Sequence, residues 1–335
     1  MQQKLGALLP DFDIRYKAEL VYEINRIKKE RGAIILGHNY MEAALFQTVP
    51  DIVGDSLELA RAAAKTNADP IVFCGVRFMA ETAKILNPDK TVLLPAQKAG
   101  CSLAASITAE DVRTLRNQFP GIPIVTYINT YADVKAECDA CCTSSNAHKI
   151  VESFKSQTVI FIPDEYLAQN VARETNKHII FPTKDLKITT SQPNFEYTLI
   201  GWHGKCEVHE KFSVDDIKNL RSQFPDVMIL AHPECSPAVV EHSDFSGSTT
   251  KMIEHIKKTN APRYVLLTEC SMADNIIAEN PEKEMVRLCS IRCPHMNEIT
   301  LEDTLNALRN NQYIIEVPED IRVRAKKAID RMLEN

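Results

Sequence analysis

Three cysteines stand in the same local context, and their thiols are the groups best suited to do chemistry in this chain. Each lies seven residues before a Ser or Thr that is followed by acids and then a basic residue: Cys101 precedes Thr108, Cys206 precedes Ser213, and Cys293 precedes Thr300. A Ser or Thr N-cap with acids in the first turn is a well-formed helix start. The repeat therefore predicts similar α/β modules, with a cysteine ahead of the same helix each time.

Metal binding is the chemistry that three such thiols favour. Thiolates select zinc or iron–sulfur centres, which usually take four protein ligands at structural sites. Three ligands leave one coordination position open, and an open iron could polarise a substrate hydroxyl or carbonyl for dehydration. The alternative, buried cysteines acting as small apolar residues, accounts less well for three equivalent positions. We therefore predict Cys101, Cys206 and Cys293 as metal ligands.

The other cysteines are weaker candidates. The segment Cys138-Asp139-Ala140-Cys141-Cys142 contains a C-x-x-C pattern, which alone indicates zinc or thiol redox chemistry. No second pair lies at a suitable spacing, so a metal role is not favoured there. Cys289, four residues before Cys293, is an alternative ligand. The remaining three, Cys74, Cys235 and Cys270, occupy positions that are typical of strand ends or of packing residues.

Polar side chains follow the first predicted strand of each module. These side chains are His38 and Tyr40, Tyr127 and Asn129, and His232 and Glu234. Their types suit acid–base catalysis and hydrogen bonding to a carboxylate or carbonyl. Because open α/β sheets bind ligands at the carboxyl ends of their strands, we expect one shared cavity.

Hydroxyl residues form a second set at predicted helix starts. They are Ser56, Ser144 with Ser145, and Ser248 with Thr249. Backbone N–H groups and hydroxyls at a helix N-terminus bind phosphate or carboxylate; simple N-capping is the alternative, and both can hold. His209, three residues after Cys206, is a further candidate for acid–base chemistry or carboxylate binding.

Helices and strands that alternate along the chain must position these residues. Apolar runs at 33–36, 122–125 and 227–230 predict buried strands, a weaker strand is expected at 285–288, and a further strand is expected at 313–317. Alternation with helices implies parallel sheets covered on both faces. We divide the chain into a first module (1–100), a second module (101–205), a third module (206–292) and a C-terminal segment (293–335) that closes on the modules.

Composition narrows the class of protein. The 335 residues are 44% hydrophobic and carry a net charge of −6, which gives no basic footprint for nucleic acid. No apolar run is long enough to span a bilayer and no signal peptide is evident, so we expect a cytoplasmic protein without a membrane partner. In that compartment, ten cysteines favour metal or redox use over a disulfide framework.

The motifs together resemble those of the quinolinate synthase family over nearly the whole chain. Besides the three cysteine contexts, the matching pieces are Gly37-His38-Asn39-Tyr40, Val53-Gly54-Asp55-Ser56-Leu57, Phe78-Met79-Ala80-Glu81, Tyr127-Ile128-Asn129-Thr130, Cys142-Thr143-Ser144, His232-Pro233-Glu234-Cys235 and Gly247-Ser248-Thr249. The resemblance implies three similar α/β/α modules about a pseudo-threefold axis, with the active site at their junction. It also implies a [4Fe–4S] cluster held by Cys101, Cys206 and Cys293.

The resemblance further implies a reaction and residue roles. The family condenses iminoaspartate with dihydroxyacetone phosphate to give quinolinate for NAD synthesis, with loss of phosphate and two waters. The predicted catalytic residues, tied to proton transfer, are Tyr40, Tyr127, Glu234 and His38. The predicted substrate-binding residues are His38, Ser56, Tyr127, Asn129, Ser144, His209, His232, Glu234, Ser248 and Thr249.

Some points depart from the family pattern or stay open. The second cysteine context, Gly201-Trp202-His203-Gly204-Lys205-Cys206, differs from the more usual Gly-Tyr-Cys-Pro or Gly-His-Cys-Pro but keeps the thiol and His209. Alternative functions are another three-cysteine [4Fe–4S] hydro-lyase, or a non-enzymatic cluster or zinc redox sensor acting through Cys138, Cys141 and Cys142. The expected partners are the small substrates and an L-aspartate oxidase or dehydrogenase that supplies iminoaspartate. Either a monomer or a homodimer is compatible with the sequence.

Overall fold

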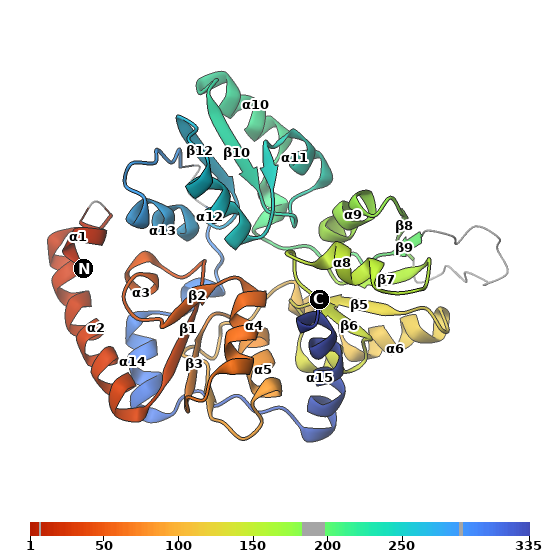
Figure 1. Cartoon of the computed structure of the whole chain (residues 1–335), viewed down its shortest axis with the longest axis horizontal. Helices are drawn as coiled ribbons and strands as arrows, with labels where there is room; N and C mark the ends of the chain where they lie inside the picture. Colours follow the sequence, from red (N-terminus) through yellow and green to blue (C-terminus); the bar gives the residue numbers. More distant parts are fainter. Residues whose placement is uncertain (7, 183–197, 288–290) are drawn as a thin grey trace.

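Short apolar runs form the strands, and within the described residues the paired strands are parallel. The computed structural model describes residues 1–6, 8–182, 198–287 and 291–335. Three separate sheets are present, one in each predicted module, and Figure 1 shows them as three lobes around a centre. The prediction of an α/β fold with three short parallel sheets is confirmed. The pseudo-threefold axis and the module boundaries stay predictions.

The first module contains a four-stranded sheet in the order β2-β1-β3-β4. Its elements are α1 (Gln2–Leu5), α2 (Asp11–Arg31), β1 (Ile34–His38), α3 (Ala43–Phe46), β2 (Ile52–Gly54), α4 (Ser56–Lys65), β3 (Ile71–Cys74), α5 (Arg77–Leu86) and β4 (Val92–Leu93). The register pairs Gly37 of β1 with Val53 of β2 and Cys74 of β3. His38 therefore lies at the carboxyl edge, where an open parallel sheet binds its ligands.

The second module contains a five-stranded sheet in the order β6-β5-β7-β9-β8. Its elements are η1 (Ala104–Ser106), α6 (Ala109–Gln118), β5 (Ile124–Tyr127), α7 (Ala132–Ala136), β6 (Ala140–Cys142), α8 (Ala147–Glu152), β7 (Val159–Ile162), α9 (Glu165–Glu174), β8 (His178–Ile180) and β9 (Thr198–Ile200). Strand β9 was not predicted, because a run of three residues carries too little periodicity to be recognised. It lies between β7 and β8 and pairs with both.

The third module contains a three-stranded sheet in the order β11-β10-β12. Its elements are η2 (His209–Lys211), α10 (Val214–Gln223), β10 (Val227–Ala231), α11 (Pro237–His242), β11 (Phe245–Ser246), α12 (Thr249–Lys258), β12 (Arg263–Leu267) and α13 (Ser271–Glu279). The prediction of a strand at 285–288 is wrong for the described part of this run. Met285 makes one bridge, to Tyr264, and Leu288 lies outside the described residues.

The predicted helix starts after the three cysteines are confirmed. Thr108, Ser213 and Thr300 are the N-caps of α6, α10 and α14. In each case an aspartate three residues later completes a capping box, so the side chains and backbone N–H groups satisfy one another reciprocally. The same local signal thus produces the same helix start three times.

One hydrogen-bonded tie recurs in all three modules. In each module, an aspartate directly before the second strand along the chain accepts the backbone N–H of an Ile in the first strand. The same aspartate pairs with a basic residue of the helix that precedes the first strand. The three ties are Lys28–Asp51–Ile35, Arg116–Asp139–Ile124 and Arg221–Asp244–Ile229, each with 2.8 Å between the Asp oxygen and the Ile nitrogen. One aspartate side chain therefore fixes a helix and two strands relative to one another, and the same arrangement occurs in all three modules.

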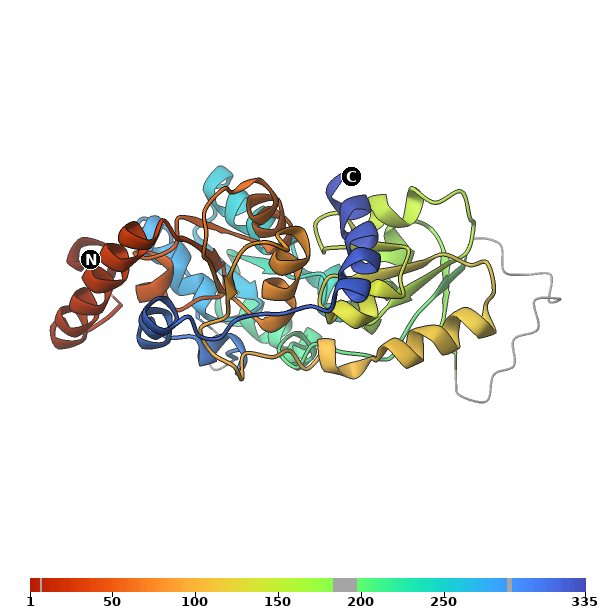
Figure 2. The ribbon, with the colours of Figure 1, turned by 90° about the horizontal axis from the view of Figure 1, so that it is seen from below.

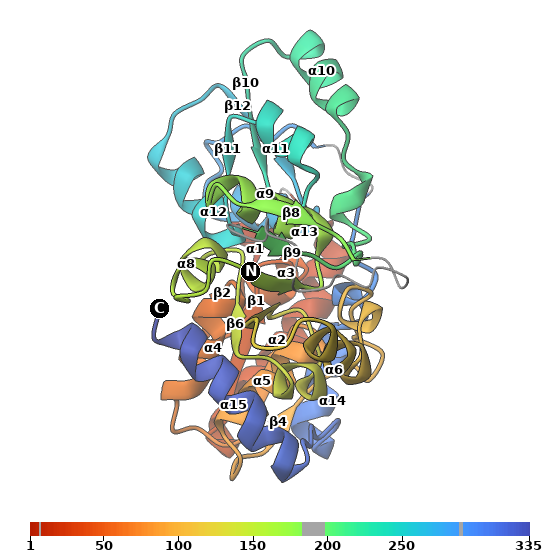
Figure 3. The same ribbon diagram turned by 90° about the vertical axis from the view of Figure 1, so that its right-hand side faces the viewer.

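The C-terminal segment joins the first two modules. It contains η3 (Met296–Glu298), α14 (Leu301–Asn310) and α15 (Glu319–Leu333). Helix α14 packs on α2 and β3, whereas α15 packs on α7, β6 and α5. Figure 2 shows the chain crossing between these helices, and Figure 3 shows α15 running along the side of the molecule. The predicted strand at 313–317 is wrong, because this run makes one antiparallel bridge, between Ile314 and Leu93.

Within the described ranges, no helix combines the length and the apolar character needed to cross a bilayer.

Replacing Asp139 by Ala tests the recurring tie. The change leaves the Ile124 N–H without its acceptor and Arg116 without its carboxylate partner. A buried donor left unpaired costs about 1–3 kcal/mol, so we expect the free energy of unfolding in a urea titration to fall by about that amount. The control is Glu254→Ala, which removes an exposed pair with Lys258 and should change stability by less than about 0.5 kcal/mol. Equal effects of both changes would show that the tie does not stabilise the module.

Candidate functional site

The modules and the C-terminal segment together line one cavity of about 710 Å³, a volume that includes the space at its mouth. The predicted site residues in its wall are His38, Tyr40, Ser56, Cys101, Tyr127, Asn129, Ser144, Cys206, His209, His232, Glu234, Thr249 and Cys293. Ser248 is the exception among the predictions: its side chain is buried and caps α12 by accepting the Lys251 N–H. Residues that are distant in sequence therefore meet at one place.

The three repeated cysteines differ from the other cysteines in their exposure. Cys101, Cys206 and Cys293 are partly exposed and line the cavity. The six other cysteines that the structure describes are buried. Cys289, the alternative ligand, lies outside the described residues. The three cysteines that the sequence repeat identified are therefore the ones whose thiols are accessible and lie in the cavity wall.

Backbone N–H groups point at each of these thiols. The Ala104 N–H donates to the Cys101 sulfur, with 3.5 Å between N and Sγ. Backbone N–H groups at the starts of η2 and η3 likewise donate to Cys206 and Cys293. Burial raises the pKa of Cys101 to about 12 and that of Cys293 to about 11, and it raises the pKa of Cys206 well above its usual value; the N–H donors oppose this rise. Donors aimed at sulfur favour the thiolate, which is the form that binds metal. The three residues therefore fit a metal centre with three thiolate ligands.

The C-x-x-C segment has a different environment. Cys141 and Cys142 are fully buried, and the Cys138 thiol donates to the Val134 carbonyl at 3.2 Å. Burial raises the pKa of all three thiols. None of them is among the residues described in the cavity wall. These features are typical of packed cysteines rather than of a reactive or metal-binding trio.

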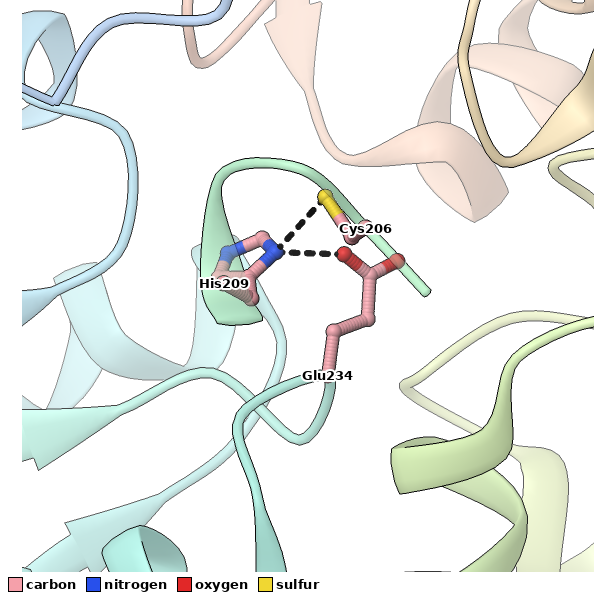
Figure 4. A group of neighbouring side chains, drawn as sticks. All are labelled: Cys206, His209 and Glu234. Carbon is pink, nitrogen blue, oxygen red and sulfur yellow. Dashed lines mark hydrogen bonds and ion pairs between the residues drawn. The ribbon is translucent and has the colours of Figure 1, made fainter. Parts of the chain in front are cut away.

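A second donor set shares Cys206. Figure 4 shows Cys206 and Glu234 on the same side of the His209 ring, and both interact with its Nδ1. This nitrogen lies 3.2 Å from the Cys206 sulfur and 2.6 Å from the Glu234 Oε2. These donor atoms all lie within 4.8 Å of one another, so this set could hold a single ion such as zinc. Burial raises the pKa of Glu234, but the adjacent His209 charge outweighs it and lowers that pKa to about 2. Glu234 is therefore an anion paired with His209.

His38 and His232 have the same bonding pattern. The His38 Nδ1 accepts the Tyr40 N–H at 3.2 Å, and the His232 Nδ1 accepts the Glu234 N–H at 3.3 Å. A backbone N–H can only donate, so in both rings the proton of the neutral form is on Nε2. Burial lowers the pKa of His38 to about 4 and that of His232 to about 3. Both rings are thus neutral hydrogen-bond donors, and His232 Nε2 lies 3.3 Å from the Ser144 hydroxyl.

A continuous hydrogen-bonded path connects Tyr40 with Glu234. The Tyr40 hydroxyl lies 2.5 Å from the Thr268 hydroxyl, which lies 2.8 Å from His209 Nε2. His209 Nδ1 then meets Glu234, which also accepts from the Tyr127 hydroxyl and from the Asn129 amide at 3.2 Å. Burial raises the pKa of Tyr40 and of Tyr127 well above 10, so both phenols keep their protons. Such a chain can move a proton between the two sides of the cavity.

The predicted anion sites at helix starts differ from expectation in one respect. The N-cap of α4 is Asp55, not Ser56, and its carboxylate already accepts the N–H groups of Leu57 and Glu58. Asp55 also accepts from the Ser145 hydroxyl at 2.8 Å. The N-terminus of α4 is therefore occupied by a side-chain carboxylate, and Ser56 contributes a hydroxyl to the cavity wall instead.

Sequence reasoning missed Thr268 and Asp164. Both follow a strand: Thr268 comes directly after β12, and Asp164 lies two residues after β7. Asp164 is fully buried, and burial raises its pKa well above the usual value. Neither residue is in the described cavity wall: Thr268 connects Tyr40 with His209, and Asp164 caps α9. The sequence signal that both share is a polar residue just after an apolar strand, and the prediction considered only the first strand of each module.

Comparisons with known proteins agree with this picture. The family described as "Quinolinate synthetase A protein" has a model that matches residues 22–334. Quinolinate synthase 2 of Mesorhizobium japonicum is 49% identical over 333 residues, which are 99% of this chain and 96% of that protein. Quinolinate synthase of Agrobacterium fabrum is 50% identical over 314 residues, 94% of this chain and 85% of its own. Quinolinate synthase of Xylella fastidiosa (strain 9a5c) is 51% identical over 315 residues, 94% and 86% of the two chains.

Thiol labelling tests the accessibility and the pKa of the three cysteines. In metal-free protein, iodoacetamide should modify Cys101 and Cys293 while Cys142 stays unlabelled, as measured by peptide mass spectrometry. Because burial raises the pKa of Cys101 to about 12 and of Cys293 to about 11, the thiolate fraction rises with pH well beyond the usual thiol pKa. We expect labelling rates to increase about tenfold per unit between pH 7 and 10. A plateau above pH 8.5 would contradict the raised pKa values.

Proposed function

The chain belongs to the quinolinate synthetase A protein family and is an enzyme, and we propose that it makes quinolinate for NAD biosynthesis. The proposed reaction condenses iminoaspartate with dihydroxyacetone phosphate and releases phosphate and two waters. Carbon, nitrogen and oxygen balance without an external oxidant, since every bond change is a condensation, an isomerisation or an elimination. The iminoaspartate would come from an L-aspartate oxidase or dehydrogenase.

One observation carries this proposal. The only partly exposed cysteines in the described part of the chain, Cys101, Cys206 and Cys293, line the same cavity as a set of neutral hydrogen-bond donors. Three thiols leave an open coordination position for a substrate oxygen. The neutral donors suit substrates that carry carboxylates and a phosphate.

A [4Fe–4S] cluster on these three cysteines is the proposed cofactor. The amides that point at the sulfurs support thiolate ligation. When bound, such a cluster supplies a Lewis-acidic iron that polarises a substrate oxygen. Glu234 and His209 lie beside Cys206, so acid–base groups stand next to the proposed metal centre.

The carboxylates of iminoaspartate and of the product would be held by neutral side chains. His232 offers its Nε2–H beside the Ser144 hydroxyl, and Thr249 offers a hydroxyl that is positioned by the Asn39 amide at 2.9 Å. Asn129 and Ser56 add an amide and a hydroxyl on the same wall. Hydrogen bonds from neutral donors bind anions in a buried site without adding a charge that would itself need burial.

Proton transfers are proposed for the two phenols and Glu234. Tyr40 and Tyr127 keep their protons and so can donate to a leaving hydroxyl or to a developing enolate oxygen. Glu234 is the anionic end of the path and can accept a proton through His209 or Tyr127. His38 is neutral and acts as a hydrogen-bond donor rather than as an acid.

The two alternative functions make different predictions. A different hydro-lyase would use the three cysteines but would not release phosphate from dihydroxyacetone phosphate. A redox sensor acting through the C-x-x-C segment requires accessible thiols, whereas Cys141 and Cys142 are fully buried. Quinolinate and phosphate formed in equal amounts by anaerobically purified enzyme would support the proposal; turnover without phosphate release would refute it.

Exchanging Cys101 for Ala tests the cluster ligands. We expect the wild-type protein, purified without oxygen, to carry about four iron and four sulfide per chain, and the variant to lose both together with quinolinate formation. The matched control is Cys138→Ala, which removes a buried thiol outside the cavity wall and should keep iron and activity. Retained activity in an iron-free Cys101→Ala protein would eliminate the Lewis-acid role.

Tyr40→Phe separates proton transfer from cluster binding. The change removes the hydroxyl that begins the path through Thr268 and leaves the three cysteines untouched. Iron content should stay unchanged, while kcat should fall about 100-fold or more, the usual range for a lost acid–base group. Tyr22→Phe, on an exposed part of α2, is the control and should keep full activity. An undiminished kcat in Tyr40→Phe would remove this residue from the mechanism.

A further inference from the structure

A buried asparagine on α9 holds a loop of the neighbouring module. Asn170 is 1% exposed, and its side-chain Nδ2 donates to the Pro233 carbonyl at 2.8 Å and to the Cys235 carbonyl at 3.0 Å. These carbonyls belong to the residues directly before and after Glu234. A helix of the second module thus binds the third-module loop through the residues on both sides of Glu234.

A buried asparagine on α13 does the same to the first module. Asn275 is 2% exposed, and its Nδ2 donates to the Asn39 carbonyl at 3.0 Å and to the Met41 carbonyl at 2.9 Å. These carbonyls flank Tyr40 in the same way. The two asparagines are equivalent in position, because each lies eight residues after the last residue of the preceding strand, Ile162 in β7 and Leu267 in β12.

Amide chemistry explains why the residue is asparagine at both places. A primary amide has two N–H donors on one nitrogen, so one side chain can satisfy two carbonyl oxygens, which a carboxylate cannot do. Among the described residues, the Oδ1 of both asparagines is buried without a partner. In both asparagines the Nδ2 group holds two carbonyls of one loop of another module, which indicates a role in placing the loops.

The boundary between the first and second modules has a link in which the buried side chain accepts a hydrogen bond from the backbone of the neighbouring module instead of donating one. On α5 of the first module, the buried Glu81 accepts the Ala132 N–H of the second module at 2.8 Å and pairs with Arg77. This contact follows the loop that carries Tyr127 and Asn129. The second module thus holds the third, the third holds the first, and the first holds the second, so the three links form a closed cycle.

We propose that Asn170 and Asn275 are positioning residues that set the substrate-binding loops of the neighbouring modules, Asn170 for His232 and Glu234, and Asn275 for His38 and Tyr40. The inference rests on the proposed function and deepens it, because it assigns the control of each cavity wall to a helix of another module. Neither asparagine is in the described cavity wall, so each acts through the loop it holds.

Crossed double-mutant cycles test this assignment with quinolinate itself as the probe. The dissociation constant is measured by calorimetry on anaerobically purified holoenzyme. Asn170→Ala and Asn275→Ala should each weaken binding about tenfold. In combination with His232→Ala, Asn170→Ala should weaken binding by less than it does in the wild-type enzyme, whereas its effect should multiply with that of His38→Ala. Asn275→Ala should show the reverse pairing. A general loosening of the fold would not make Asn170→Ala non-additive with His232→Ala alone and Asn275→Ala non-additive with His38→Ala alone.

Controls keep each outcome decisive. Asn280→Ala removes the C-cap side chain of α13, whose amide donates to the Ile276 carbonyl of that helix, and it should leave the dissociation constant unchanged. Asn170→Ser and Asn275→Ser keep a smaller donor and replace the Ala variants if circular dichroism shows that those do not fold. Unchanged affinity in folded variants, or effects that multiply in all four combinations, would overturn the positioning role. A wild-type enzyme that neither forms nor binds quinolinate would instead overturn the proposed function, and the inference with it.

Discussion

The bond between an imidazole Nδ1 and the backbone N–H two residues later is the constraint from which the site follows. In His38 and His232 this bond shapes the turn after the strand and fixes the ring proton on Nε2, which serves as a donor. The N–H that makes the bond belongs to Tyr40 in one loop and to Glu234 in the other. A single short-range interaction therefore sets the tautomer of one functional side chain and the backbone position of the next, and it does so in two modules.

Burial then decides which groups carry charge. It keeps His38 and His232 neutral and the two tyrosines protonated, while Glu234 stays ionised because His209 lies 2.6 Å away. The described residues in the cavity wall include neither Lys nor Arg. The hydrogen-bond donors of the cavity wall are thus neutral, and they share the wall with the Glu234 carboxylate and the three cysteine thiols. This combination suits a reaction in which an oxygen must be polarised and protons must be moved.

Local patterns in the sequence were sufficient to predict the parts of the site that each module builds alone. The cysteine spacing, the N-caps Thr108, Ser213 and Thr300, and the polar residues after β1, β5 and β10 all depend on short-range rules. The three N-caps are confirmed, and the cysteines and polar residues line one cavity. Contacts between modules leave no such trace. Thr268 joins Tyr40 to His209, and Asn170 reaches Pro233, only because the modules dock. Asp55 displaced Ser56 as the α4 cap because either residue fits the local pattern.

No single module contains a complete set of functional groups, so cavity formation is coupled to docking. The second module supplies Tyr127 and Cys101, the third Glu234 and Cys206, and the first Tyr40, while Cys293 comes from a segment that continues into α14 on the first module and α15 on the second. In the interfaces, the buried Nδ2 groups of Asn170 and Asn275 and the carboxylate of Glu81 find their hydrogen-bond partners on another module. A misplaced module would therefore leave donors and acceptors unpaired at the same time as it opened the cavity. Hydrogen-bonding requirements at the interfaces thus enforce the geometry that the chemistry needs.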